Sequence, residues 1–148
     1  MKFESYFIDF IKLLNKNEVE YMLIGGMAVN VHGYSRSTGD MDIWMNSTIE
    51  NGNKILKTID EFGFDIEPIR DKDFTIADVI FVGGPPFRID VLTKVQGVKF
   101  EDAWPKKINI TVDDIIINVI GLEDLKAVKM LSGRHKDMDD LYNLNKIV

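Results

Sequence analysis

Apolar residues follow two different periods along the chain, and each change of period marks the boundary of an expected element. Residues three or four apart share one face of a helix, whereas alternate residues share one face of a strand. Helical spacing is found in residues 3–14, 27–32, 49–62, 125–131 and 138–142. Strand-like runs occupy residues 19–24, 41–45, 64–69, 76–82, 88–92, 108–112 and 115–119.

These elements predict one α/β (α+β) domain over residues 1–148, with a mixed β-sheet flanked by helices. The sequence has no internal repeat, no low-complexity tract and no linker rich in Pro or Ser. The two helical patterns from about residue 122 are expected to pack on the same core. The spacing from Ser47 to Glu50 is that of a capping box, which predicts the start of the third helix.

Composition and charge exclude several classes of function. The absence of cysteine excludes a disulfide framework, a zinc–thiolate site and a cysteine nucleophile. Lys and Arg total 18 against 24 Asp and Glu, so the net charge of −6 argues against holding nucleic acid by charge alone. The longest apolar stretch, residues 21–29, is too short to span a membrane. The cytoplasm is the expected compartment.

Two aspartates mark the most informative strand. Asp40 and Asp42 share one face of it with Trp44, because side chains alternate along a strand. Two carboxylates so close together repel one another unless a cation lies between them. Magnesium is the expected cation, because it binds carboxylates together with substrate phosphates.

A pair of glycines, Gly25 and Gly26, lies between a strand and a short helix. Glycine lets the backbone approach a ligand closely, and the N–H groups that begin a helix attract phosphate. Followed by the Asp40–Asp42 strand, this bend predicts that nucleotide phosphates bind beside the metal. By itself, a glycine pair is more often a plain tight turn.

A third carboxylate is placed by the same alternation, since Arg88 and Asp90 share one face of a later strand. If that strand neighbours residues 41–45, Asp90 joins Asp40 and Asp42. Two metal ions about 3.5–4 Å apart then clamp the entering and leaving oxygens of a phosphoryl displacement. Asp90 would complete the metal shell and accept the proton of the attacking hydroxyl. From the residues alone, Asp90 is equally a metal ligand or a partner of Arg88.

Together these motifs resemble the nucleotidyltransferase superfamily with the polymerase-beta-like fold, in its small prokaryotic branch related to AbiEii-type toxins. The resemblance runs roughly from residue 19 to residue 144. The matching residues are Gly25-Gly26, His32-Gly33, Arg36, Thr38, Asp40-Met41-Asp42-Ile43 and Arg88-Ile89-Asp90-Val91-Leu92. The tail adds Leu122-Glu123-Asp124-Leu125, Lys129, Gly133-Arg134, Lys136-Asp137 and Asp140.

The resemblance implies transfer of a nucleoside monophosphate from an NTP to an acceptor hydroxyl, with release of pyrophosphate and with Mg²⁺ as cofactor. It assigns roles to matched positions only. The implied metal ligands are Asp40, Asp42 and Asp90. Lys129 with Asp137 or Asp140 corresponds to a Lys/Asp motif near the nucleotide, and Gly25 and Gly26 line the phosphates. Many relatives carry a hydroxyl residue at the second glycine, and many have a further helical domain for the acceptor; this chain has neither.

Several positions also have a plain structural interpretation. Arg36 is expected to brace the triphosphate from the loop that also contains Thr38, although a loop arginine is usually only solvated. His32 is expected to be structural. Trp44 is expected to pack in the wall rather than stack on a base. Lys129 lies off the apolar stripe of its helix, where a lysine is usually solvated.

Three functions remain open at this point. The first is Mg²⁺-dependent nucleotidyl transfer to a small molecule, tRNA or protein. The second is a catalytically weak nucleotide-binding or toxin–antitoxin module that works with a partner protein. The third is a metal-dependent phosphohydrolase, which uses the same acids and needs a positioned water.

Overall fold

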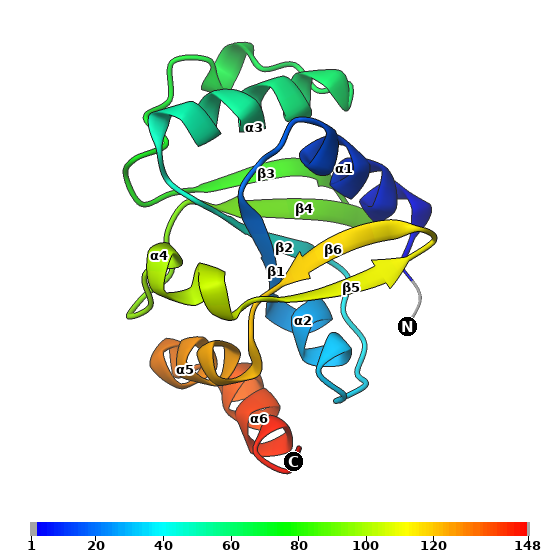
Figure 1. Ribbon diagram of the computed structural model, residues 1–148, viewed down its shortest axis with the longest axis vertical. Coiled ribbons are helices and arrows are strands. Elements are labelled where there is room, and N and C mark those ends of the chain that lie inside the picture. The colour runs from blue at the N-terminus through cyan, green and yellow to red at the C-terminus, as the bar shows by residue number, and fades with distance from the viewer. Residues whose placement is uncertain (1–2, 148) are drawn as a thin grey trace.

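The central sheet of the computed structural model, which describes residues 3–147, has six strands in the order β3-β4-β2-β1-β6-β5 (Figure 1). The strands are β1 (Tyr21–Ile24), β2 (Met41–Met45), β3 (Val79–Gly84), β4 (Phe87–Leu92), β5 (Ile108–Val112) and β6 (Ile115–Val119). β2 runs parallel to β4, and β1 parallel to β6, while the other neighbours are antiparallel. The predicted mixed sheet is therefore confirmed.

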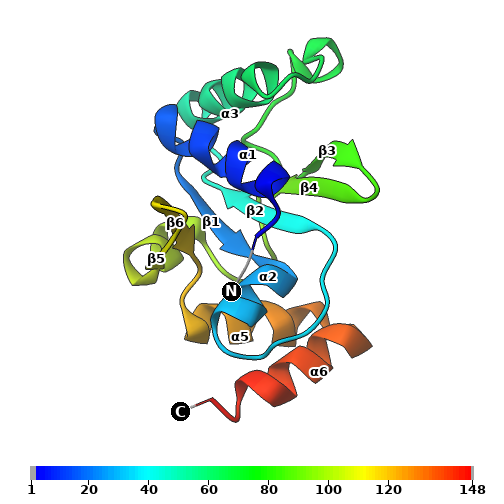
Figure 2. The same cartoon turned by 90° about the vertical axis from the view of Figure 1, so that its right-hand side faces the viewer.

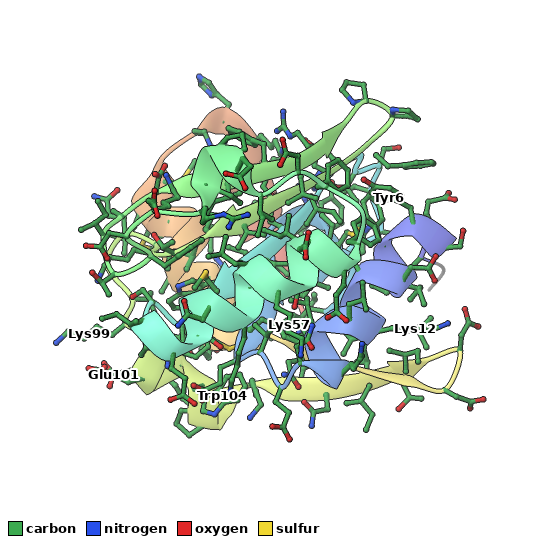
Figure 3. The ribbon with its side chains drawn as sticks, turned by 90° about the horizontal axis from the view of Figure 1, so that it is seen from above. Tyr6, Lys12, Lys57, Lys99, Glu101 and Trp104 are labelled. Atoms are coloured by element: carbon green, nitrogen blue, oxygen red, sulfur yellow. The ribbon has the colours of Figure 1, made fainter. Side chains whose placement is uncertain are left out.

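Helices lie on both sides of this sheet. They are α1 (Ser5–Lys16), α2 (Gly25–Val31), α3 (Ile49–Glu61), α4 (Phe100–Ala103), α5 (Leu122–Ser132) and α6 (His135–Leu144), with single 3₁₀ turns η1 (Glu67–Ile69) and η2 (Trp104–Lys106). Figures 1 and 2 show α1 and α3 on one side, and α2, α5 and α6 on the other. Figure 3 looks onto α1 and α3, whose exposed sides carry Lys12 and Lys57.

The core lies between these layers. Phe10 and Leu14 of α1, Ile55 of α3 and the β2 residue Ile43 are fully buried. On the other side, Leu125 of α5 is also fully buried. Burial of such side chains contributes most of the stability of a domain of this size.

Three local predictions differ from the structure. Residues 64–69 contain the turn η1 rather than a strand, because Pro68 donates no backbone hydrogen bond and suits the start of a turn. Strand β3 begins at Val79, after a turn, instead of at residue 76. The cap of α3 is Thr48, whose side chain accepts from the Asn51 amide at 3.1 Å, and not Ser47.

The pairing of β2 with β4 positions the chemistry. Asp42 lies directly opposite Asp90, and Ile24 and Phe81 continue the same row on the outer neighbours β1 and β3. Paired residues of a sheet point to the same face. One row of side chains therefore runs across four strands in the order Ile24, Asp42, Asp90 and Phe81.

Candidate active site

A cleft of about 770 Å³ opens over this row. Its lining comes from the β1–α2 junction, residues 36–40, strands β3 and β4, and the helices α5 and α6. In Figure 2, β3 and β4 lie above α5 and α6 on the right-hand side. The predicted site residues Gly25, Gly26, Arg36, Thr38, Asp40, Asp42, Asp90, Lys129 and Asp137 all line the cleft.

The glycine bend brings the backbone against the aspartates. Gly25 has a φ of +70°, and a Cβ there would collide with the Asp42 carboxylate. Glycine is therefore required for two reasons: only glycine adopts this backbone conformation easily, and only glycine leaves room for the Asp42 carboxylate. A Cβ on Gly26 would lie 2.6 Å from the Thr38 hydroxyl oxygen. Thr38 thus places a hydroxyl beside the position where many relatives carry one.

Arg88 holds two of the three aspartates. Its Nε lies 2.7 Å from Asp90 Oδ1, and its Nη2 lies 3.0 Å from both Asp90 Oδ2 and Asp40 Oδ2. Such a two-pronged contact is a strong form of ion pair. Hydrogen bonding to Asp90 raises the pKa of the Arg88 guanidinium, so the side chain stays charged. Asp90 therefore lies beside Asp42 and also binds Arg88.

Asp42 forms no ion pair within residues 3–147, although the charge of Lys129 acts to lower its pKa. Its burial, together with the charges of Asp90 and Asp40, raises its pKa from 3.8 to about 6. A nearby cation would stabilise the ionised carboxylate and so lower this pKa. The all-oxygen donor set of Asp42 and Asp90 suits Mg²⁺, so these residues fit the implied ion.

The three predicted metal ligands do not form a ready-made metal site. Within residues 3–147, no three acidic or histidine side chains are already arranged to share a metal ion. The reason lies in the contacts of Arg88, which draws Asp40 and Asp90 toward its guanidinium. The assignment of three ligands and two ions stays a prediction.

Lys129 belongs to a buried ion network between α5 and α6. Its Nζ lies 2.9 Å from Asp137 Oδ1 and 3.0 Å from Asp140 Oδ2, and both carboxylates are completely buried. Burial opposes ionisation of Asp137, but hydrogen bonds from Ser132, Arg134 and Lys129 outweigh it and lower the pKa of Asp137 to about 2. The lysine, expected to be either solvated or catalytic, is 4% exposed.

Arg36 connects this network to the loop before β2. Its Nε and Nη2 donate to the two oxygens of Asp140 at 2.7 and 2.9 Å. Arg36, predicted to brace the triphosphate, therefore binds the Asp140 carboxylate through its guanidinium group. Asp140 was only an alternative to Asp137 on sequence grounds, yet it contacts both Lys129 and Arg36. Its helical spacing of three from Asp137 was the available signal.

Two other expectations concern structural residues. The ring of His32 is 2.7 Å from the carbonyl oxygen of Ile120, which directly follows β6, and this confirms a structural contact. Trp44 is 1% exposed and packs edge-to-face on Phe100, with ring centres 5.3 Å apart. The wall-packing interpretation is confirmed. Phe81, which lines the cleft, was not singled out from the sequence.

No helix in the described part of the chain is long and apolar enough to cross a membrane.

Comparison of the fold with solved structures gives several nucleotidyltransferases. The lincosamide antibiotic adenylyltransferase LnuA, solved with lincomycin bound, superposes with a TM-score of 0.64 at 18% identity, over 99% of this chain and 98% of that one. A putative nucleotidyltransferase from Thermotoga maritima gives 0.68 at 16% identity, over 96% and 92%. ANT(2")-Ia in complex with adenylyl-2"-tobramycin gives 0.58 at 8% identity, over 95% and 86%. At these identities the likeness shows a shared fold.

Sequence comparison leads to the same family. A search of curated proteins gave no match. A family model described as "Nucleotidyltransferase of unknown function (DUF6036)" matches residues 2–147. The predicted superfamily is confirmed, while the finer relation to AbiEii-type toxins stays a prediction. The chain is a nucleotidyltransferase and belongs to the DUF6036 family.

Proposed function

We propose that this protein transfers a nucleoside monophosphate from an NTP to the hydroxyl of a small acceptor, with Mg²⁺ as cofactor. The observation that carries the proposal is the row formed by the glycine bend, Asp42 and Asp90 on adjoining strands. Phosphates at the bend and carboxylates beside them are the two halves of a phosphoryl-transfer site.

The chain's own residues have distinct tasks in this reaction. Backbone N–H groups at Gly25 and Gly26 hold the leaving phosphates, and the Thr38 hydroxyl adds one donor. Asp42 and Asp90 would hold the metal, with Asp40 as the third ligand. A bound Mg²⁺ supplies positive charge at the transferring phosphoryl group.

The proposed transfer is a single displacement at the α-phosphorus of the NTP. The acceptor oxygen forms a bond to the α-phosphorus, and the bond from that phosphorus to the bridging oxygen breaks. Pyrophosphate leaves with the electron pair, and Asp90 takes the proton of the acceptor hydroxyl. Arg88, 2.7 Å from Asp90, holds that carboxylate in place.

Small acceptors are favoured by the structural neighbours. LnuA has a chain almost entirely covered by this one and was solved with lincomycin bound. ANT(2")-Ia was solved with adenylyl-2"-tobramycin. Both neighbours therefore support a small-molecule acceptor for this fold. The test below also includes tRNA and protein as alternative acceptors.

The test is transfer with ATP, GTP, CTP or UTP, Mg²⁺ and each of lincomycin, tobramycin, tRNA or the protein itself. The expected result is pyrophosphate release together with an acceptor heavier by one nucleoside monophosphate. The matched variant Asp42→Asn should lose about a hundredfold or more in rate, because a metal ligand is removed. Absence of pyrophosphate from every mixture would refute the proposal, and release of free nucleoside monophosphate would favour the phosphohydrolase.

One observation favours a second candidate, a nucleotide-binding module of the same fold that turns over weakly or not at all. Arg88, Arg36 and Lys129 all have their charges paired within the chain. Nucleotide binding without transfer, with co-purification of a partner chain, would support this candidate and the toxin–antitoxin interpretation.

A further inference from the structure

Strand β3 presents apolar side chains to the cleft at the far end of the aspartate row. Phe81 is 60% exposed and Val79 is 37% exposed, whereas the intervening Ile80 and Val82 are buried. Phe81 is paired with Asp90 in the sheet, and Val79 with Leu92, and all four line or flank the same face. A large exposed aromatic ring beside a catalytic carboxylate is the kind of apolar surface that a ligand covers.

The order of residues across the sheet indicates which ligand this is. In an in-line displacement, the attacking and leaving oxygens lie on opposite sides of the phosphorus. The proposed function, on which this step rests, places the leaving pyrophosphate at Gly25 on the β1 side of Asp42. The attacking hydroxyl must then approach from the opposite side, beyond Asp90, where Phe81 lies.

The same geometry excludes the nucleoside from this position. The ribose is attached to the α-phosphorus through an oxygen that lies off the line joining the attacking and leaving oxygens. The sugar and base therefore project sideways from the row of residues Ile24, Asp42, Asp90 and Phe81. The base therefore does not extend beyond Asp90 to reach Phe81. The exposed ring belongs to the acceptor half of the cleft.

Charges around Phe81 narrow the chemistry of the acceptor. The Arg88 guanidinium lies 4.8 Å from the centre of the Phe81 ring. Lys94, exposed at the end of the same wall, adds a second positive charge. The Arg88 charge is balanced by Asp40 and Asp90, so it does not exclude a positively charged acceptor. An anionic acceptor would be repelled by the triphosphate. We infer that the acceptor is a non-anionic hydroxyl compound with a flat apolar ring, which rests on Phe81 and Val79.

The test measures binding, so that it does not depend on turnover. The probes are 2-naphthol, a flat uncharged hydroxyl compound, and tobramycin, a polyamine, each titrated in the presence of Mg²⁺ and α,β-methylene ATP. The proteins are wild type, Phe81→Ala, Phe81→Trp and the control Ile116→Ala, which removes an equally exposed apolar side chain on β6. Binding of the ATP analogue alone is measured for each protein.

The expected result is that wild type, Phe81→Trp and Ile116→Ala bind 2-naphthol alike, while Phe81→Ala binds it about tenfold more weakly. All four should bind the ATP analogue equally, and binding of tobramycin, which has no flat apolar ring, should not depend on Phe81. Equal binding of 2-naphthol by Phe81→Ala, or parallel loss of the ATP analogue, would overturn the acceptor assignment alone. Failure of the wild type to bind the ATP analogue would overturn the proposed function as well.

Discussion

The carboxylates at the two sides of the cleft are held in opposite ways. On the sheet, Asp42 lies beside two further acids, and its pKa is raised to about 6. Between α5 and α6, Asp137 is surrounded by donors, and its pKa is lowered to about 2. Asp42 forms no ion pair within the described residues, whereas Asp137 has three side-chain donors. This difference supports the proposal that the sheet side binds a ligand, while the ion pairs of the helix side stabilise the wall of the cleft.

The largest effect is expected from removing the centre of the helix network. Lys129→Ala leaves two fully buried carboxylates without their shared cation, so the free energy of unfolding should fall by about 3–5 kcal/mol. Urea unfolding measures the loss. The control Lys126→Ala, whose partner Glu123 is exposed, should lose less than about 1 kcal/mol. A Lys129→Ala protein of normal stability that has lost transfer would instead make Lys129 catalytic.

The next effect is the pH dependence of stability, which should differ between the sheet side and the helix side of the cleft. Because the folded pKa of Asp42 lies above its usual 3.8, ionised Asp42 destabilises the fold above about pH 6, and this cost is gone below pH 3.8. Asp42→Asn should therefore be more stable than wild type by about 3 kcal/mol at pH 7.5 without metal, and the advantage should vanish toward pH 4. Urea unfolding at several pH values measures it.

Asp137→Asn is the matched control, and its dependence has the opposite sign. The folded pKa of Asp137 lies below 3.8, so its ionised form stabilises the protein above that pH, and the contribution is lost as the pH falls toward 2. This variant should be less stable than wild type at pH 7.5. Equal behaviour of the two variants would contradict the comparison.

A smaller effect is expected from freeing the aspartates of their internal cation. Arg88→Ala removes the guanidinium that holds Asp40 and Asp90, so Mg²⁺ should bind about tenfold more tightly. Titration calorimetry with Mg²⁺ alone measures this affinity. Arg88→Lys keeps the charge and should remain near wild type. Weaker binding by Arg88→Ala would mean that the arginine arranges the ligands rather than competing for them.

The smallest effect concerns the hydroxyl beside the glycine bend. Thr38→Ala should weaken binding of MgATP by about three- to tenfold, the value of one hydrogen bond, and Thr38→Ser should restore it. Equilibrium dialysis measures both. If the alanine variant binds like wild type, the hydroxyl contributes no phosphate contact.

Local patterns were sufficient for the parts of the site that lie on one strand. Alternation placed Asp40 and Asp42 together and Arg88 with Asp90, and the glycine pair marked the bend. Strand order joins these pieces, and it depends on long-range pairing that no local pattern contains. The resemblance to the nucleotidyltransferase superfamily implies that connection, and β2 does pair with β4.

The misses have the same origin. Phe81 follows the alternation of a half-buried strand, and only the position of β3 at the edge of the sheet exposes it. Lys129 lies off an apolar stripe and looks solvated until α6 covers it. Residues 64–69 have the apolar spacing of a strand, but Pro68 favours a turn there, so the predicted strand is wrong.

The contact between Arg36 and Asp140 joins residues 104 positions apart in the sequence. During synthesis on the ribosome, the glycine bend and the first acids emerge long before the residue that fastens their loop. A nascent chain that lacks α6 therefore has an unfastened loop, so the proposed nucleotide site is complete only after Asp140 has emerged.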